Sequence, residues 1–377
     1  MKVKLRDVSN IIMGQSPDSS TYNTEKIGLP FFQGNADFGE LNPIAKTWCS
    51  APIKIAYKNY ILISVRAPIG ALNIAAETCC IGRGLAAFDV NNKMCTQKYL
   101  WYLLKAKKNE LLSKGTGSTF KAISKNILSE MEFNIPPVRE QELCTKVLDV
   151  VFCLIRLKKE QLDKLDLLVK SRFIEMFGDP VSNPKGWILK KLSDLGQFKN
   201  GINFHFDDAG IEIYCLGVGN FKNNDVLNNM KELSLISLSN LPSEEYFLHD
   251  NDIVFVRSNG NKALVGRCLA VYPGEVPVIF SGFCIRFRKN NDSILIPYLL
   301  HILKCESVRR KLTGRGANIQ NLNQQILGNL IIPLPPLELQ NRFATFVIET
   351  NKSKLAIQQS LDELETLKKS LMQQYFG

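Results

Sequence analysis

The chain of 377 residues is long enough for two or three domains, and its 45% hydrophobic and 22% charged residues are typical of a folded globular protein rather than a disordered one. Its 47 lysine and arginine residues exceed its 36 acidic residues, and the resulting net charge of +11 favours a polyanionic partner. The amino terminus lacks a signal-peptide core, and no stretch approaches the ~20 apolar residues of a membrane span. We therefore expect a cytoplasmic protein without a membrane partner.

The first segment, residues 1–138, mixes short β-rich runs with turns and a short helix. Residues 61–65 are typical of a strand, and residues 99–112 are typical of a helix. This mixture predicts an α+β domain of ordinary size. The pair Pro136-Pro137 ends the domain, because a helix cannot continue through it.

A long helix is predicted over residues 139–178, where no proline or glycine occurs from Arg139 to Phe177. A helix of roughly 38 residues is on the order of 55 Å long at 1.5 Å rise per residue. Its apolar residues recur at alternating steps of three and four, the seam pattern of a coiled coil, with polar breaks at Lys158 and Arg172. The predicted pairing residues are Leu148, Val151, Ile155, Leu162, Leu165 and Val169.

The same order of parts follows again, with a mixed α and β segment over residues 179–337 and a second long helix over residues 338–377. This helix also has an imperfect seam, with breaks at Lys354 and Lys368. We expect the two helices to pair with each other as an antiparallel coiled coil, although each could instead pack on its own domain. The pairing residues predicted in the second helix are Val347, Ile357, Leu361, Leu364 and Leu371.

The chain is a tandem repeat. Residues 99–178 align without gaps with residues 298–377, and about a quarter of the aligned positions are identical, where unrelated composition would give about one in twenty. The first halves agree more loosely and with a drifting offset, as expected when insertions occur in surface loops. In those halves, Lys4-Leu5-x-Asp7 aligns with Lys191-Leu192-x-Asp194, Gly34-Asn35 with Gly219-Asn220, and Val65-Arg66 with Val256-Arg257.

No catalytic or metal-binding constellation stands out in the sequence. It contains no phosphate loop, no G-x-S-x-G elbow and no H-E-x-x-H zinc helix. The three histidines do not belong to a set of His and Cys residues typical of a zinc site, so we expect no metal site. The ten cysteines include no C-x-x-C pair, and we expect them to be reduced and mostly buried.

The duplicated series Ile-Pro-Pro-Val-x-x-Gln (135–141) and Leu-Pro-Pro-Leu-x-x-Gln (334–340) carries a family resemblance. Each series is preceded by a Gly-x-Gly loop and an Ile-Leu pair and is followed by a long helix. In these features, and in the order of its parts over its whole length, the chain resembles the specificity subunits of type I restriction-modification systems.

The resemblance implies a DNA-recognition subunit that is not itself an enzyme. In that family, each globular domain is a target-recognition domain that reads one half of a split, asymmetric target on double-stranded DNA, and the helices set the spacer between the halves. The implied partners are two copies of an adenine-N6 DNA methyltransferase subunit and a motor nuclease subunit for cleavage. This chain should bind no cofactor, since S-adenosylmethionine, ATP and magnesium are expected on the partner subunits only.

Candidate DNA-reading residues are the polar and basic residues of the glycine-containing loops, because forked donors and acceptors read base edges while lysines contact phosphate. Each of them could instead have a structural or solvated role. The candidates in the first domain are Gln15, Ser16, Gln33, Asn35, Arg66, Arg83 and Lys114. Those in the second domain are Asn200, Asn203, Asn220, Arg257, Asn259, Arg315, Asn318 and Gln320.

Two other classes of function remain open from the sequence. The chain could be a non-catalytic protein-protein scaffold with two adaptor domains on a coiled coil, or an enzyme that modifies DNA itself. A scaffold would show neither salt-dependent DNA retention nor copurification with a methyltransferase, whereas a modifying enzyme would bind S-adenosylmethionine alone.

Overall fold

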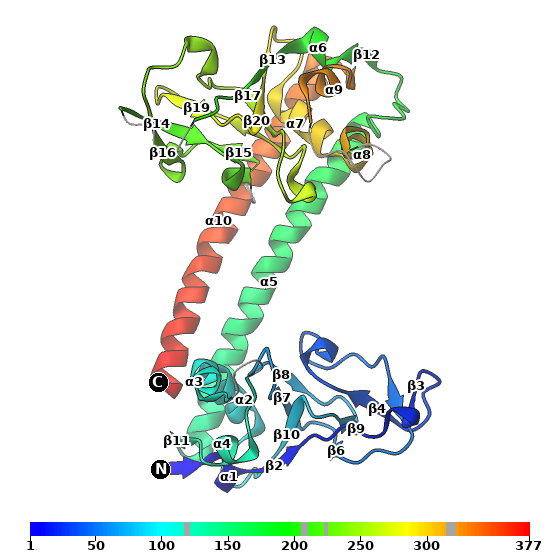
Figure 1. Ribbon diagram of the computed structural model, residues 1–377, viewed down its shortest axis with the longest axis vertical. Coiled ribbons are helices and arrows are strands. Elements are labelled where there is room, and N and C mark those ends of the chain that lie inside the picture. Colours follow the sequence, from blue (N-terminus) through cyan, green and yellow to red (C-terminus); the bar gives the residue numbers. More distant parts are fainter. Residues whose placement is uncertain (117–120, 205–209, 222–224, 314–321) are drawn as a thin grey trace. The chain divides into compact units, whose positions relative to one another are not determined.

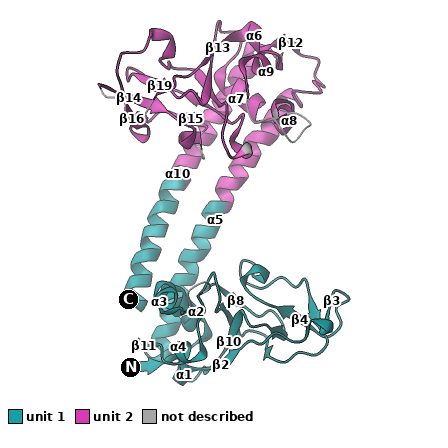
Figure 2. Cartoon of the chain, in the orientation of Figure 1, with its two compact units in different colours: residues 1–159, 358–377 teal, residues 160–357 magenta. Residues whose placement is uncertain are grey.

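The computed structural model describes residues 1–116, 121–204, 210–221, 225–313 and 322–377. The chain divides into two compact units (Figure 2): unit 1 comprises Met1–Lys159 and Gln358–Gly377, and unit 2 comprises Glu160–Ile357. Each unit therefore contains one globular region and parts of both long helices (Figure 1). None of the helices in the described ranges is long and apolar enough to cross a membrane.

The described residues of the first repeat form eleven strands, four short α-helices and one long α-helix. Its strands are β1 (Lys2–Lys4), β2 (Ser9–Met13), β3 (Tyr22–Asn23), β4 (Leu29–Phe32), β5 (Trp48–Cys49), β6 (Ile55–Ala56), β7 (Ile61–Ser64), β8 (Leu72–Ile74), β9 (Cys79–Ile81), β10 (Leu85–Val90) and β11 (Glu132–Asn134). Its helices are α1 (Leu5–Val8), α2 (Gln97–Ala106), α3 (Lys108–Lys114), α4 (Lys125–Ser129) and α5 (Val138–Phe177).

The second repeat follows the same plan in the part of it that is described. Its strands are β12 (Ile188–Lys191), β13 (Gly196–Asn200), β14 (Ile211–Leu216), β15 (Val226–Leu227), β16 (Ser234–Leu238), β17 (Asp252–Val256), β18 (Cys268–Val271), β19 (Val278–Phe280), β20 (Cys284–Lys289) and β21 (Ile331–Leu334). Its helices are α6 (Leu192–Leu195), α7 (Ile296–Lys304), α8 (Glu306–Thr313), α9 (Gln324–Gly328) and α10 (Leu337–Phe376).

The sheets of the two repeats correspond strand by strand in their centres. The order β2-β10-β7-β8 in the first repeat matches β13-β20-β17-β18 in the second, and all of these neighbours are antiparallel. A parallel pair, β4 with β9 or β14 with β19, lies in a second sheet in each case. The two repeats therefore share one α+β fold, as the sequence repeat predicts, and they differ in their edge strands.

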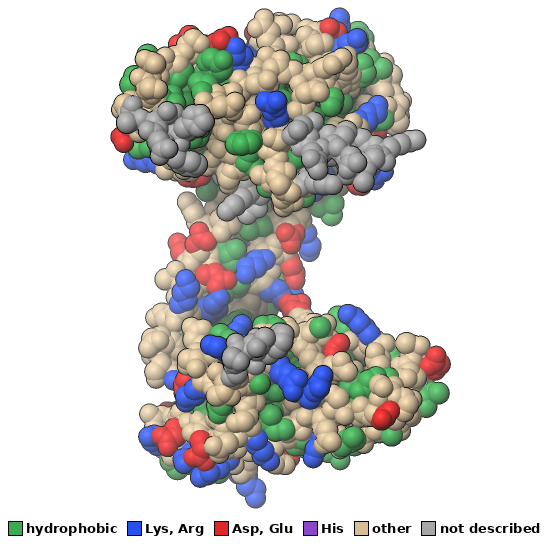
Figure 3. Space-filling view, viewed as in Figure 1, with side chains coloured by type: hydrophobic (Ala, Val, Ile, Leu, Met, Phe, Trp, Pro, Cys, Tyr) green, Lys and Arg blue, Asp and Glu red, His purple; other side chains and the backbone are tan. Residues whose placement is uncertain are grey.

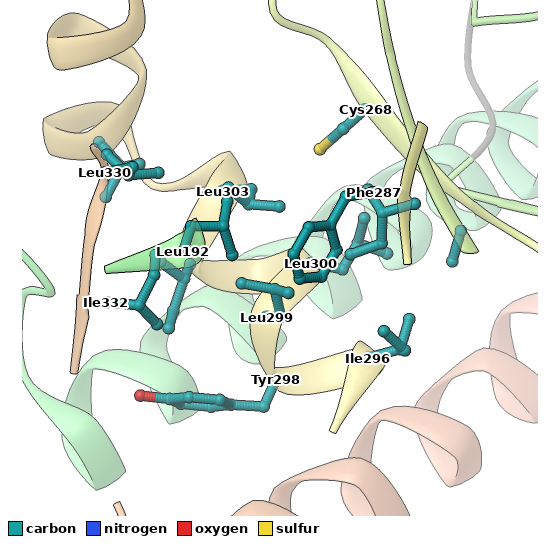
Figure 4. Close-up of a cluster of buried hydrophobic side chains, with 14 of the residues drawn as sticks. Leu192, Cys268, Phe287, Ile296, Tyr298, Leu299, Leu300, Leu303, Leu330 and Ile332 are labelled. Atoms are coloured by element: carbon teal, nitrogen blue, oxygen red, sulfur yellow. The ribbon is translucent and has the colours of Figure 1, made fainter. Parts of the chain in front are cut away.

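A largely buried apolar helix lies at the centre of each core. In unit 2, α7 buries Tyr298, Leu299 and Leu303, and Figure 4 shows these side chains beside Phe287 of β20 and Leu192 of α6. In unit 1, α2 buries its equivalent residues in the same way. Of the ten cysteines, which are all free, most are buried and Cys153 is exposed.

The short helix predicted in the first repeat is in fact two helices, and its counterpart in the second repeat is divided in the same way. The sequence predicts one helix over 99–112, but the chain turns at Lys107, whose ψ of 10° ends α2 before α3 begins. In the second repeat, Cys305 has extended backbone with ψ of 135° and separates α7 from α8. The single-helix prediction was wrong because neither break involves a proline or glycine that would reveal it.

The two long helices, each of 40 residues, pair in an antiparallel manner within each unit. In unit 1, Leu148 near the start of α5 and Phe376 at the end of α10 share one core, and Lys159 pairs with Glu365 at 3.3 Å. In unit 2, the Phe173 and Phe343 rings lie 5.4 Å apart between centroids. The polar break at Lys354 forms an ion pair with Asp166 of the other helix.

Every residue predicted to pair the helices is buried or half-buried. Buried ones are Leu148, Val151, Ile155, Val169, Val347 and Leu361, and half-buried ones are Leu162, Leu165, Ile357, Leu364 and Leu371.

A fully buried glutamine links the start of each long helix to its globular region. In unit 1, the Gln141 amide oxygen accepts a bond from the Thr96 backbone N–H at 2.8 Å, and its Nε2 donates to the Met94 and Pro136 carbonyls, both at 2.9 Å. In unit 2, Gln340 makes the equivalent three bonds, to Leu295, Ser293 and Pro335. The duplicated Pro-Pro-x-x-x-Gln pattern is therefore a structural joint.

We predict that Gln141→Ala destabilises unit 1 by about 2 to 4 kcal/mol, because three buried backbone groups lose their partners. Thermal unfolding and amide hydrogen exchange at Thr96 would measure the effect. Gln374→Ala, an exposed glutamine of the same unit, is the matched control. Equal stability of the two variants would contradict this role for Gln141.

Candidate nucleic-acid interface

In unit 1, the loops that follow β2, β4 and β9 cross at one point. The Gln15 N–H donates to the Ile81 carbonyl at 3.0 Å, and the Gly82 N–H donates to the Phe32 carbonyl at 2.8 Å. The Gly84 N–H donates to the Gln33 carbonyl at 3.1 Å. We call these three connected loops, residues 14–16, 33–35 and 82–84, the first loop frame.

Glycine is required where the strands of this frame cross. A Cβ atom on Gly14 would lie 2.1 Å from the Gly82 carbonyl oxygen, and one on Gly84 would lie 2.3 Å from the Gln33 oxygen. Because backbone cannot move away as a flexible side chain can, only glycine fits at these positions. The close crossing holds the neighbouring side chains on a fixed support.

Six of the seven candidates in the first domain lie on this frame or beside it. Gln15, Gln33 and Arg83 are exposed, and Ser16 accepts a bond from the Arg83 backbone N–H at 3.3 Å. Arg66 is also exposed, and it follows Val65, whose N–H donates to the Gly84 carbonyl at 2.9 Å. These side chains together offer amides, a hydroxyl and two guanidinium groups.

The remaining candidates of the first domain are Asn35, which lies on the frame, and Lys114, which lies outside it. Asn35 is half-buried in the turn that follows Gly34, where Asp37 caps the backbone. Lys114 ends α3 and pairs with Glu110 one turn earlier at 2.6 Å. Lys114 is therefore solvated and partly neutralised. Figure 3 shows further lysine and arginine side chains on the visible face of unit 1.

Unit 2 repeats the same backbone frame. The Ile202 N–H donates to the Phe280 carbonyl at 2.9 Å, and the Ser281 N–H donates to the Leu216 carbonyl at 3.0 Å. A Cβ atom on Gly201 would lie 2.2 Å from the Ser281 oxygen, so glycine is again required. We call loops 201–203, 217–220 and 281–283 the second loop frame.

These hydrogen bonds correct part of the alignment of the repeats. Val65 and Arg257 hold equivalent places, because their carbonyls accept from Ile123 and Leu322 and their N–H groups donate to Gly84 and Phe283. The alignment of Val65-Arg66 with Val256-Arg257 is therefore wrong by one residue.

The alignment of Gly34-Asn35 with Gly219-Asn220 is wrong as well. The Gly34 and Gly217 N–H groups each donate to the side chain three residues later, so Gly34 matches Gly217. The identical residues that suggested these two alignments lie in loops, where no periodic pattern of core residues fixes how the two repeats align.

By contrast, the alignment of Asp7 with Asp194 is confirmed. Each carboxylate accepts from the N–H of the lysine three residues earlier, at 2.8 and 3.2 Å.

The candidates of the second domain divide into exposed and structural residues. Asn203 is exposed, and Arg257 is half-buried with its Nη1 donating to the Gly282 carbonyl at 3.5 Å. Asn220 and Asn259 both accept backbone bonds inside their own turns, from Gly217 and Asn261. Asn200 is half-buried at the end of β13. The remaining candidates lie outside the described residues: Arg315, Asn318 and Gln320.

The sequence interpretation missed one residue of the second loop frame. Phe283 is 60% exposed, between Gly282 and the buried start of β20. A single sequence does not reveal that a phenylalanine is exposed, because apolar residues are normally predicted to lie in a core. Among the described residues, no group of three or more His, Cys, Asp and Glu side chains could hold a metal ion.

A second surface lies on α5 within unit 1. Leu143, Val147, Val150, Leu154 and Leu157 are all exposed and recur at alternating steps of four and three, so they form one apolar stripe. We call these five residues the α5 stripe. The stripe is flanked by two exposed basic residues, Arg139 and Lys146. Neither of them forms an ion pair with a described residue.

The equivalent positions of α10 carry no such stripe. They are Arg342, Phe346, Glu349, Ser353 and Ala356, of which Phe346 packs against the core of unit 2. The apolar stripe is therefore present in one repeat only.

Comparison with known proteins gives a consistent result. The profile of the family "Type I restriction modification DNA specificity domain" matches residues 1–167 and again residues 184–366. The putative type I restriction enzyme MjaX specificity subunit of Methanocaldococcus jannaschii is 40% identical over 156 residues, which cover 41% of this chain and 37% of that protein. The MjaIX specificity subunit of the same organism is 24% identical over 91% of this chain and 85% of its own length.

A solved structure has the same fold. The S subunit of a type I restriction-modification system from M. genitalium superposes with a TM-score of 0.61 at 15% identity, over 100% of this chain and 96% of that one.

We predict that Arg257→Ala weakens binding to duplex DNA by roughly 1 to 3 kcal/mol, because the variant loses a forked donor that can pair with a guanine. Titration of a labelled duplex at fixed salt would measure the loss. Arg342→Ala, an exposed arginine of α10 outside the loop frames, is the control. Unchanged affinity together with unchanged sequence preference would reject the assignment of Arg257.

Proposed function

The chain belongs to the family of type I restriction-modification DNA specificity subunits, and from this premise we propose that it reads a bipartite, asymmetric target on double-stranded DNA. The chain is the non-catalytic, DNA-recognising component of its system. One target-recognition domain would read each half of the target.

One observation supports the proposal most directly: the two units have the same pattern of backbone hydrogen bonds in their loop frames, but different side chains on them. Gln15 and Ser16 of the first loop frame correspond to Ile202 and Asn203 of the second, since the hydrogen bonds of Gly14 and Gly201 match. Donors, acceptors and apolar groups distinguish base edges in the major groove. Two frames with matching backbone hydrogen bonds and different side chains are therefore suited to two different half-sites.

The net charge of +11 supports a DNA partner as well, because lysine and arginine side chains that contact phosphates release the counterions of the DNA. The long helices would set the unread spacer between the half-sites, since each of them spans 40 residues, or about 60 Å.

The proposed protein partners are two copies of an adenine-N6 DNA methyltransferase subunit, with a motor nuclease subunit added for cleavage. S-adenosylmethionine, ATP and magnesium would be bound by these subunits. The α5 stripe supports docking of one methyltransferase copy, because an exposed apolar row flanked by Arg139 and Lys146 fits an amphipathic helix with an acidic edge.

Exchanging residues 1–138 for the equivalent region of another specificity subunit should change one half of the recognised target and leave the other half unchanged. The physical reason is that each loop frame is held within its own unit. Sequencing the methylated sites of the hybrid system tests this, and the reciprocal exchange of residues 179–337 is the control. A hybrid in which both halves change would show that reading is not modular.

The double variant Val150→Asp and Leu154→Asp should lower the affinity for one methyltransferase copy by roughly a hundredfold. Docking would bury both aliphatic side chains, and their burial contributes about 3 kcal/mol or more. Mass measurement of the assembled complex would then find one copy in place of two. Leu355→Asp, at an exposed leucine of α10 outside the stripe, is the control. A double variant that still holds both copies would exclude the stripe as a docking surface.

A further inference from the structure

Phe283 is unusual among the phenylalanines of this protein. Among the phenylalanines in the described ranges, it alone is exposed, with 60% of its surface accessible. The next residue, Cys284, is fully buried at the start of the central strand β20. The ring therefore stands outside the core, directly beside one of its most buried strands.

The backbone of Phe283 is held firmly within the second loop frame. Its N–H donates to the Ser281 hydroxyl at 3.3 Å, and its carbonyl accepts from the Arg257 N–H at 2.8 Å and the Ser258 N–H at 3.4 Å. On its other side, a Cβ atom at Gly282 would lie 1.9 Å from the Asn203 amide oxygen. The ring thus extends from a fixed backbone among candidate DNA-reading residues.

The two loop frames place different chemistry at this crossing. The first has Arg83 followed by Gly84, where the glycine is needed because a Cβ atom would meet the Gln33 oxygen at 2.3 Å. The second has Gly282 followed by Phe283 at the equivalent positions, since Leu85 and Cys284 begin the matching strands. At this pair of positions, the side chain of the first frame is a charged donor, and that of the second frame is an apolar ring, one residue later.

We propose that Phe283 is a specificity-determining residue that contacts the C5-methyl group of a thymine in the half-site read by the second domain. This inference rests on the proposed function. The thymine methyl is the apolar group that base pairs display in the major groove, and phenylalanine is suited to contact it. The Arg257 N–H bonds to the Phe283 carbonyl, and the Asn203 amide lies beside Gly282, so both residues are placed to make polar contacts with neighbouring bases.

The test uses the full chain and a duplex carrying its target, after that target has been determined from methylated sites. Each thymine of the half-site is replaced in turn by deoxyuridine, which lacks only the methyl group. We expect one position at which the wild-type chain binds about fourfold more weakly, since one buried methyl contributes about 0.8 kcal/mol.

Phe283→Ala should bind the thymine and uracil duplexes equally at that position, and Phe283→Leu should retain part of the difference. Tyr57→Ala removes another exposed aromatic ring, of unit 1, and should leave the difference unchanged. Thermal unfolding of Phe283→Ala should match the wild type, because the ring is exposed.

Two results would overturn the inference while leaving the proposed function intact. One is a half-site in which no thymine-to-uracil change affects binding. The other is a Phe283→Ala variant that keeps the full difference, or that loses affinity equally for every duplex, as expected of a wedge between base pairs. A wild-type chain that binds no duplex at all would instead contradict the proposed function.

Discussion

Each long helix ends in a phenylalanine that packs in the core beside the opposite repeat. In unit 2, the Phe177 ring at the end of α5 lies 4.7 Å from the Tyr298 ring of α7, and in unit 1 the Phe376 ring of α10 lies 5.1 Å from the Tyr99 ring of α2. Each core therefore contains side chains from both repeats. Because of this exchange, the helices are integral to the two units, and the buried glutamines at their starts join them to the preceding domain.

Each loop frame has a fixed backbone that supports its side chains. Backbone hydrogen bonds and obligatory glycines fix where the loops cross, so side chains on them can change without altering the fold. The chemistry of the matching loops differs accordingly, with Arg83-Gly84 in one frame and Gly282-Phe283 in the other. Reading two different sequences with one fold, as we propose for this chain, would require this separation between support and readout.

Much of this organisation could be predicted from the sequence, because duplication and helical periodicity leave strong signals. The seam residues, such as Leu148 and Val347, follow from spacing alone. The sequence did not predict the breaks at Lys107 and Cys305, or the one-residue shift that makes Val65 equivalent to Arg257. These features depend on backbone hydrogen bonds between distant loops, which no local pattern reports.

The most direct measurement of the central claim is to sequence the methylated adenines in a host that carries this chain together with its methyltransferase. Two different loop frames should yield two different short sequence blocks, each containing a methylated adenine, separated by an unspecified spacer of constant length. A single contiguous block, two identical blocks or a spacer of variable length would contradict the account.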